Sequence, residues 1–183
     1  MTTPLRTVSL ALWAIAALAA DIQVWAVPSV VKIRPDHPPQ ASNAVWDAES
    51  RTVTVAGARN EHVPFQIVIS APPPPSRYAS PASGFFVEAS DLKSGQARVP
   101  REQIHLYLEP YILCYAASSP VGSTGFWPDA LAPLSEPFSM AAEFRRAVRN
   151  RPLWVDILVP ADAPAGEYAG YLRVTQQAKL VAE

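Results

Sequence analysis

Prolines recur along the whole chain and limit the regular structure that it can form. There are 20 of them in 183 residues, against only 7 glycines, and this is about twice the usual proline share of roughly 5%. Proline has no N–H to donate to a helix or to the middle of a strand ladder. The chain therefore cannot be a helical bundle, and we predict short strands with rigid connections.

Runs with strand character follow one another, with turn-forming residues between them. They are Ile22 to Val27, Val30 to Ile33, Thr52 to Ala56, Pro64 to Ser70, Phe85 to Ala89, Ile104 to Leu113, Leu153 to Val159 and Glu167 to Thr175. In several runs apolar and polar residues alternate, which turns one face toward a core and the other toward solvent. The expected fold class is all-β, a two-layer antiparallel β-sandwich of the immunoglobulin or jelly-roll kind.

The strand pattern also predicts which residues form the core. Phe65, Ile67, Ile69, Leu172 and one of Trp154 and Val155 are expected in the core or along its edge. Only Met140 to Val148 has helical character, and its charged residues make it too polar for a core helix. We expect a loop or one exposed turn there.

The amino terminus has the pattern of an export signal. One apolar run, Thr7 to Ala20, follows Arg6 and contains the small-x-small sequence Ala17-Leu18-Ala19 that a signal peptidase reads. The run is shorter than the ~20 residues that cross a bilayer, although an uncleaved anchor is the alternative. We expect residues 1–19 to be a signal peptide and 20–183 the β-sandwich domain, secreted or periplasmic and without a membrane association after cleavage.

Composition bounds the partners and the source of stability. Hydrophobic residues make up 49% of the chain and charged residues 17%, so a sizeable core is available. The net charge is −1 and no basic run follows a phosphate backbone, so we expect no nucleic-acid partner. Cys114 is the single cysteine, which excludes an intramolecular disulfide.

Motifs that carry chemistry are missing from the sequence. His37, His62 and His105 stand singly, without the spacing that places two imidazoles on one face, so no transition-metal site is expected. There is no glycine-rich phosphate loop and no Gly-x-Ser-x-Gly elbow. Acid pairs such as Asp129 with Glu109 or Glu136 carry no information, because any 16 acids yield such pairs. We expect no catalytic residue and no cofactor in this chain.

Three segments are more informative than composition. Arg59-Asn60-Glu61 stands directly before a predicted strand, and Pro128-Asp129-Ala130-Leu131 follows Trp127 in a proline-fixed loop. The third segment contains Trp154-Val155-Asp156 and then Asp162-Ala163-Pro164-x-Gly166-x-Tyr168-x-Gly170, two strands joined by a turn. In this order and spacing, over about Val24 to Thr175, the three segments resemble the amino-terminal β-sandwich of glycoside hydrolase family 123 and its relatives among secreted bacterial proteins.

The resemblance implies a fold and a neighbouring domain. In such proteins the sandwich packs against a following TIM barrel, whose Asp-Glu pair cleaves β-linked N-acetylhexosamine, and no residue here matches that pair. The chain stops eight residues after Thr175, where the family would continue toward its barrel. We therefore expect a non-catalytic accessory domain of a secreted glycoside-hydrolase-like protein acting on amino-sugar glycans, with the barrel missing because the chain is a fragment or a truncated product.

Two other functions remain open on the sequence. In a free-standing carbohydrate-binding module, exposed aromatic residues such as Tyr111, Tyr115 and Trp127 would stack on sugar rings. In an immunoglobulin-like adhesion or assembly domain, there would be no sugar ligand. A coplanar row of aromatic rings on one sheet would favour the module.

We expect one surface to meet the partner domain, formed by Gly125 to Leu134 together with Arg59 and Glu61. Within it, Trp127 and Asp129 stand in a segment expected to be exposed, and aromatic residues and arginine are enriched at interface centres. The alternative is that Trp127 folds back over the open end of the sandwich. Arg59 and Glu61 could likewise form an internal ion pair that braces the strand entry.

Overall fold

The computed structural model describes residues 22–76, 78–117, 119, 122–141 and 147–183. The predicted signal peptide lies outside these residues. All strand pairs described are antiparallel, and the helical structure in the same residues is one 3-10 turn, η1 (Arg101–Gln103). None of the described segments forms a helix long and apolar enough to span a membrane.

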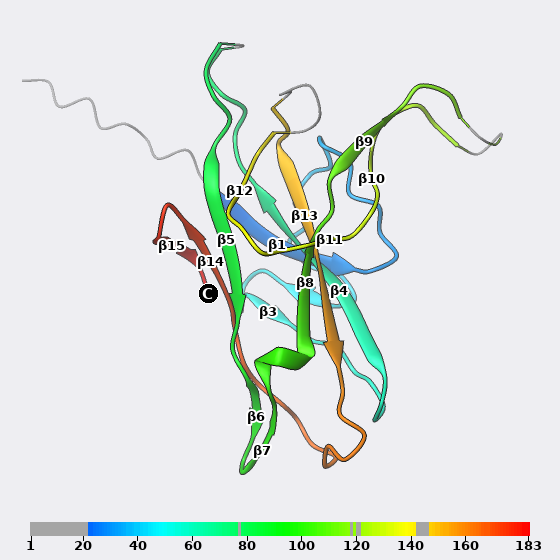
Figure 1. Cartoon of the computed structure of the whole chain (residues 1–183), viewed down its shortest axis with the longest axis vertical. Helices are drawn as coiled ribbons and strands as arrows, with labels where there is room; N and C mark the ends of the chain where they lie inside the picture. The colour runs from blue at the N-terminus through cyan, green and yellow to red at the C-terminus, as the bar shows by residue number, and fades with distance from the viewer. Residues whose placement is uncertain (1–21, 77, 118, 120–121, 142–146) are drawn as a thin grey trace, which may run out of the picture.

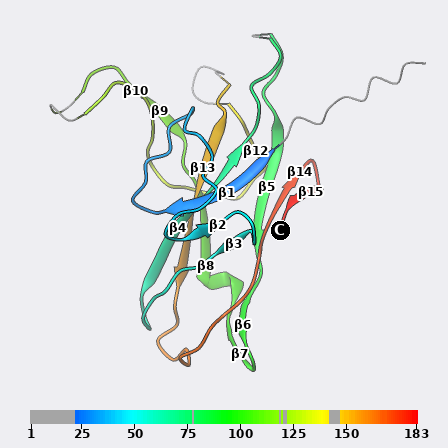
Figure 2. The same ribbon diagram turned by 180° about the vertical axis from the view of Figure 1, so that it is seen from behind.

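The strands form two principal sheets and three small hairpins (Figures 1 and 2). The larger sheet has the order β1 (Gln23–Pro28), β4 (His62–Ser70), β13 (Asn150–Leu158), β8 (Ile104–Leu108) and β11 (Ala132–Pro133). The smaller sheet has the order β12 (Phe138–Ser139), β5 (Ser83–Ala89), β14 (Leu172–Gln176) and β15 (Lys179–Ala182). The hairpins pair β2 (Trp46–Asp47) with β3 (Thr52–Val53), β6 (Leu92–Ser94) with β7 (Ala97–Val99), and β9 (Tyr111–Cys114) with β10 (Gly125–Pro128).

The core lies between the two sheets, which confirms the predicted antiparallel β-sandwich. Buried side chains of both sheets join one cluster, including Leu153 and Val155 from β13, Phe85 from β5 and Val174 from β14. The predicted core positions are confirmed as well: Phe65, Ile67, Ile69 and Val155 are buried, whereas Trp154 and Leu172 are half-buried.

The other face of the larger sheet is covered by the segment 29–40. Alternate residues of β4 point to opposite faces, and on this face Gln66 donates from Nε2 to the carbonyl oxygens of Ser29 at 2.9 Å and Val31 at 2.7 Å. The N–H of Val31 donates to Pro28 O in a turn and its carbonyl accepts from Gln66, so neither group pairs with a strand, and Val30 to Ile33 is not a strand, contrary to the prediction. Ile33 is nevertheless fully buried.

Three other predicted strands are shorter than expected. Ile104 to Leu113 is split into β8 and β9, because Pro110 has no N–H for the ladder and the N–H of Glu109 bonds to Pro152 O at 3.1 Å. Thr52 to Ala56 and Glu167 to Thr175 pair only over β3 and β14. The short strands β2, β6, β7, β10, β11, β12 and β15 were not predicted, since two to four residues carry little periodic pattern.

The ends of the segment Met140 to Val148 are buried, with exposed fractions of 2% and 4%. The N–H of Val148 donates to Met140 O at 3.0 Å, and Ala141 and Ala147 form a bridge. The expected exposure is therefore wrong for both ends, because each apolar end packs inward. Residues 142–146 lie outside the described residues.

Candidate functional site

The predicted interface tryptophan belongs to the projecting β9–β10 hairpin (Figure 1). Trp127 is half-buried, and its Nε1 donates to Ser123 O at 2.9 Å. The guanidinium of Arg34 lies over the indole ring, 4.3 Å from its centroid. Arg34 also donates to Ser123 Oγ and Thr124 O, both at 3.2 Å. Trp127 therefore has partners within its own chain and stiffens the base of the hairpin.

We expect Trp127→Ala to destabilise the domain by about 1–2 kcal/mol, since a cation–π pair and a hydrogen bond are lost together. Arg34→Ala should cost a similar amount. The double variant should lose clearly less than the sum of the two, as measured by urea unfolding, because both remove the same contact. Fully additive losses would show that the ring and the guanidinium do not stabilise each other.

The other predicted residues around the hairpin differ in exposure. Tyr115 is 78% exposed at the end of β9, and Asp129 is exposed, with its N–H donating to Pro110 O at 3.1 Å. Tyr111 is only 1% exposed. The expectation that Tyr111 could stack on a sugar ring is therefore wrong, because its apolar ring packs with Phe126 and Val148 in a second small core.

Arg59 and Glu61 lie in an exposed turn at the far end of the larger sheet. Asn60 has a positive φ of 59°, its N–H donates to Val159 O, and the Glu61 carboxylate accepts from the N–H of Ala58. No ion pair joins Arg59 to Glu61, both of which the structure describes, and both side chains are exposed. The alternative of an internal ion pair that braces the strand entry is therefore wrong.

The predicted surface combines Arg59 and Glu61 with the β9–β10 hairpin, and these two groups lie at opposite ends of β13. Its last residue, Leu158, pairs with His62 beside the Arg59–Glu61 turn, whereas its first residue, Asn150, pairs with Ser70. The β9–β10 hairpin begins just after Glu109, whose N–H donates to the carbonyl oxygen of Pro152, close to Asn150. A strand of 9 residues spans about 30 Å, so the expectation of one continuous surface is wrong. Their separate roles as contact residues stay predictions.

A buried polar cluster, which the sequence does not predict, lies at the base of the β9–β10 hairpin. Glu109 is 3% exposed, and burial raises the pKa of its carboxyl to about 7, although the charge of Lys32 opposes this. Burial also raises the pKa of Tyr111 and lowers that of Arg151. Glu109 Oε1, Tyr111 Oη and Arg151 Nε are buried without a hydrogen-bond partner among the described residues. In the sequence, the only sign of this cluster is that its charged residues stand directly beside apolar runs.

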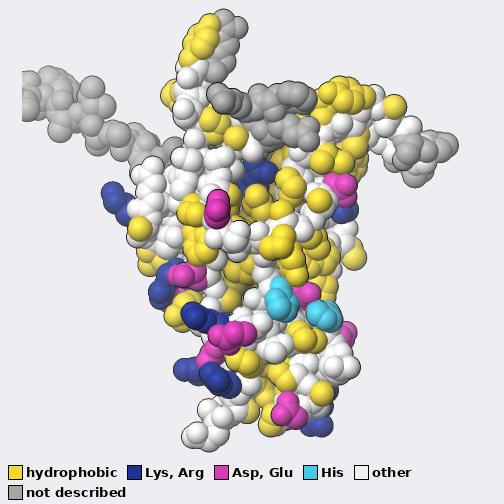
Figure 3. Space-filling view, viewed as in Figure 1, with side chains coloured by type: hydrophobic (Ala, Val, Ile, Leu, Met, Phe, Trp, Pro, Cys, Tyr) yellow, Lys and Arg dark blue, Asp and Glu magenta, His cyan; other side chains and the backbone are white. Residues whose placement is uncertain are grey.

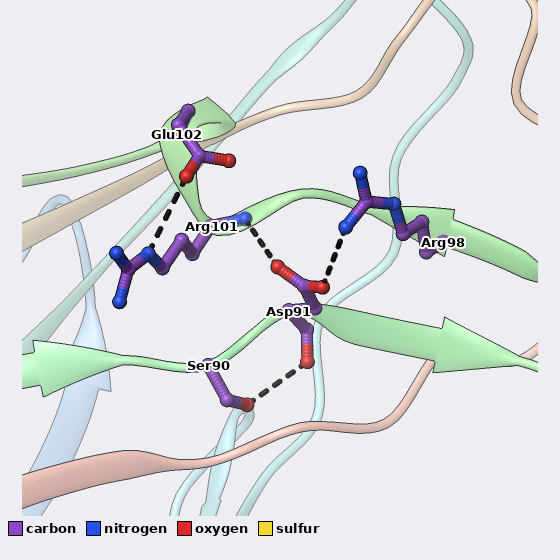
Figure 4. A network of polar contacts seen from close by, with 5 residues as sticks. All are labelled: Ser90, Asp91, Arg98, Arg101 and Glu102. Atoms are coloured by element: carbon purple, nitrogen blue, oxygen red, sulfur yellow. Dashed lines mark hydrogen bonds and ion pairs between the residues drawn. The ribbon is translucent and has the colours of Figure 1, made fainter.

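A second polar network lies on the surface between β5 and η1 (Figure 4). Asp91 accepts from the backbone N–H of Arg101 at 2.9 Å and from Arg98 Nη1 at 3.0 Å, which lowers the pKa of its carboxyl. With Glu88, Tyr171 and Arg173, the network lines an open hollow of about 500 Å³. Acidic and basic side chains are intermixed at the lower left of Figure 3. The described lining of this hollow combines three acids, Glu88, Asp91 and Glu102, with three arginines, so it offers charge and hydrogen bonds.

Asp91 should act mainly as a brace for the corner between β7 and η1. We expect Asp91→Ala to speed hydrogen exchange at the Arg101 amide, because its acceptor is removed. In the wild-type protein the protection factor of this amide, the intrinsic exchange rate divided by the observed one, should fall as the pH falls through the lowered pKa, since the bracing requires the ionised carboxylate. Glu102→Gln, which leaves that acceptor in place, is the control. Unchanged exchange in Asp91→Ala would rule out the brace.

No group of three or more His, Cys, Asp or Glu side chains among the described residues could hold a metal ion. Cys114 is half-buried and unpaired at the end of β9.

Comparison with known proteins agrees with this architecture. A family model described as the glycoside hydrolase 123 N-terminal domain matches residues 39–176. A solved family 123 glycoside hydrolase from Clostridium perfringens, studied for glycolipid glycan hydrolysis, shares the fold with a TM-score of 0.50 and 17% identity. That match covers 66% of this chain and only 19% of the other. No curated protein matches. Because the family model spans most of the sandwich, the chain belongs to the glycoside hydrolase 123 N-terminal domain family.

Proposed function

We propose that this domain is a non-catalytic accessory module of a secreted glycoside-hydrolase-like protein that acts on amino-sugar glycans. The family match over residues 39–176 carries the proposal. The state of the acids in the open polar hollow supports it, since Asp91 and Glu102 bond to Arg98 and Arg101 and the pKa of Asp91 is lowered, whereas the general acid of a glycosidase needs a raised pKa. Hydrolysis of a glycoside needs two carboxyl groups held across one bond.

The partner in this proposal is a catalytic barrel that follows the sandwich in the same polypeptide. The hairpin end of the domain is suited to meet it, because Tyr115 and Leu131 are 78% and 46% exposed there. Apolar side chains that gather on a surface often mark the place where a partner binds. Arg59 and Glu61, at the other end of β13, lie outside this contact region.

A hydrolysis assay tests the absence of catalysis. Purified protein is expected to release no aryl group from aryl β-N-acetylhexosaminides, because the required carboxylate pair belongs to the barrel. A parallel assay of Asp129→Asn identifies any contribution of the exposed acid in the loop after β10. Turnover by the wild-type chain that disappears in this variant would overturn the accessory role.

The docking region can be tested by comparing two lengths of chain. The DNA that follows the codon for Glu183 is sequenced, and any open frame is expressed together with this domain. Tyr115→Ser should then lower the melting temperature of the longer chain but not of the shorter one. Leu180→Ser, which changes an exposed residue of β15, should affect both lengths equally. Equal effects of Tyr115→Ser on both lengths would argue against docking at the hairpin.

We also propose export, based on the apolar run and the Ala17-Leu18-Ala19 sequence. Expression in a bacterium with a signal peptidase should yield a mature protein that begins at Ala20, as measured by intact mass. Ala17→Lys together with Ala19→Lys should prevent this cleavage. Full-length protein in the wild-type preparation would instead favour a retained anchor.

A further inference from the structure

The most unusual charge in the domain is the guanidinium of Arg151, which is almost completely buried. Arg151 is the second residue of β13 and is 3% exposed. Its Nη2 donates to the carbonyl oxygen of Ala141, and the ring of Tyr111 lies 5.6 Å from its Cζ. Its Nε has no hydrogen-bond partner among the described residues. The ion pairs of the described residues include no carboxylate for Arg151.

Arg151 also lines an open hollow at one end of the sandwich. Arg151 pairs with Ile69 in the register of β4 and β13, and it reaches the same hollow as Phe138 and Ser83 of the smaller sheet. The hollow has a volume of about 370 Å³, and Arg151 is the only charged residue among the described residues that line it. Two serines, Ser83 and Ser139, add hydroxyl groups, whereas Leu108, Pro110, Pro137 and Phe138 add apolar surface.

A buried guanidinium without a counter-charge is costly, since the interior solvates it poorly. Its planar array of N–H donors matches the two oxygens of a carboxylate. Because the described lining carries a single positive charge, a monoanion balances it, whereas a doubly charged phosphate would leave a negative charge among apolar side chains. The volume falls within the roughly 300–1,000 Å³ of small-molecule sites.

We propose that this hollow binds a small monocarboxylate, with the carboxylate on the Arg151 guanidinium and the body of the ligand against Phe138 and the prolines. A hexuronic acid has the required charge, hydroxyl groups for the two serines and an apolar C–H face. This binding does not depend on the accessory role proposed above, because it concerns a ligand of the sandwich itself.

The test uses the full chain with sodium acetate, sodium glucuronate and glucose as probes, at constant ionic strength. Binding is followed by the NMR shifts of the arginine side-chain N–H groups and the amides of Ser83 and Ser139. Acetate and glucuronate should give saturable shifts at these positions, and neutral glucose should not. Sulfate, which is doubly charged, should bind more weakly than acetate.

Substitutions then identify the residue responsible. Arg151→Lys keeps the charge but loses the forked geometry, so carboxylate binding should weaken roughly tenfold. Arg151→Met should abolish saturable binding. Arg149→Met, which changes an exposed arginine two residues away, should leave it unchanged. If Arg151→Met does not fold, the Arg151→Lys comparison still decides.

The proposal would be overturned if the folded wild-type protein showed no saturable carboxylate binding. It would equally be overturned if Arg151→Lys bound carboxylates as tightly as the wild type, or if glucose bound as tightly as glucuronate. Glu143 lies outside the described residues, and Glu143→Gln tests whether the chain supplies its own counter-ion. Markedly tighter acetate binding to that variant than to the wild type would mean that it does, and would also overturn the proposal.

Discussion

The folded domain is expected to lose about 3 kcal/mol of stability as the pH rises from about 4.5 to 7, through Glu109 alone. Burial raises the pKa of this carboxyl from 4.5 to about 7, and each pKa unit corresponds to about 1.4 kcal/mol. Because the folded state holds the proton more tightly, the contribution is fully present below the unfolded pKa and is lost as the pH passes the folded pKa. Lys32 acts in the opposite direction, since its positive charge favours the carboxylate.

The measurement is the free energy of unfolding from urea titrations between pH 4 and 8, for the wild type and Glu109→Gln. The glutamine is neutral at every pH, so the difference between the two profiles isolates this side chain from other titrating groups. Glu109→Gln should be the more stable protein at pH 8, and its advantage should vanish near pH 4. Glu88→Gln is the control for removing an acid elsewhere. Parallel profiles for the wild type and Glu109→Gln would contradict the prediction.

Asn150→Asp is expected to destabilise the domain by at least about 3 kcal/mol. Asn150 is fully buried, and its Nδ2 donates to the carbonyl oxygens of Arg34 at 3.0 Å and His37 at 2.7 Å. Its Oδ1 accepts from Ser70 Oγ at 2.6 Å. A carboxylate of the same shape would place a buried negative charge against two carbonyl oxygens, and each unsatisfied group costs about 1–3 kcal/mol.

Asn150→Ala should also be costly, because the same two carbonyl oxygens and Ser70 lose their partner. Thermal and urea unfolding measure both losses. Asn60→Asp is the matched control, since it makes the same chemical change in an exposed turn that an aspartate tolerates. A loss for Asn150→Asp that is no larger than for Asn60→Asp would show that the segment 29–40 is held by its apolar contacts instead.

The fold class could be predicted because its signal is local. In β4 and β13 the apolar residues are numerous and the strands are 9 residues long, so the pattern stands out from the turns on either side. Phe65, Ile67 and Ile69 were placed in the core for that reason. Strands of two residues, such as β2 and β11, exist only because a neighbouring strand supplies their hydrogen bonds, and no local pattern predicts them.

The site was only partly predictable, because the predicted residues are brought together or separated by the sheet register. Arg59 and Trp127 are residue types that are enriched at interface centres, which predicts a shared surface, yet they lie at opposite ends of β13. Tyr111 was expected on the surface, but the proline break after β8 directs its ring into a second core. In the sequence Glu109 is one acid among 16 with nothing to distinguish it, although it is the acid whose burial raises its pKa to about 7.

By itself, the sequence determined the all-β class, the core residues of the long strands and the family, because strand periodicity and motif spacing are properties of neighbouring residues. The tertiary structure alone decided which charges are buried. Arg151 and Glu109 are charged side chains like many exposed ones, and only the packing of β8, β9 and β13 removes them from water. Desolvation depends on everything around a group, including residues far away in the chain, and that is why it cannot be found from local sequence.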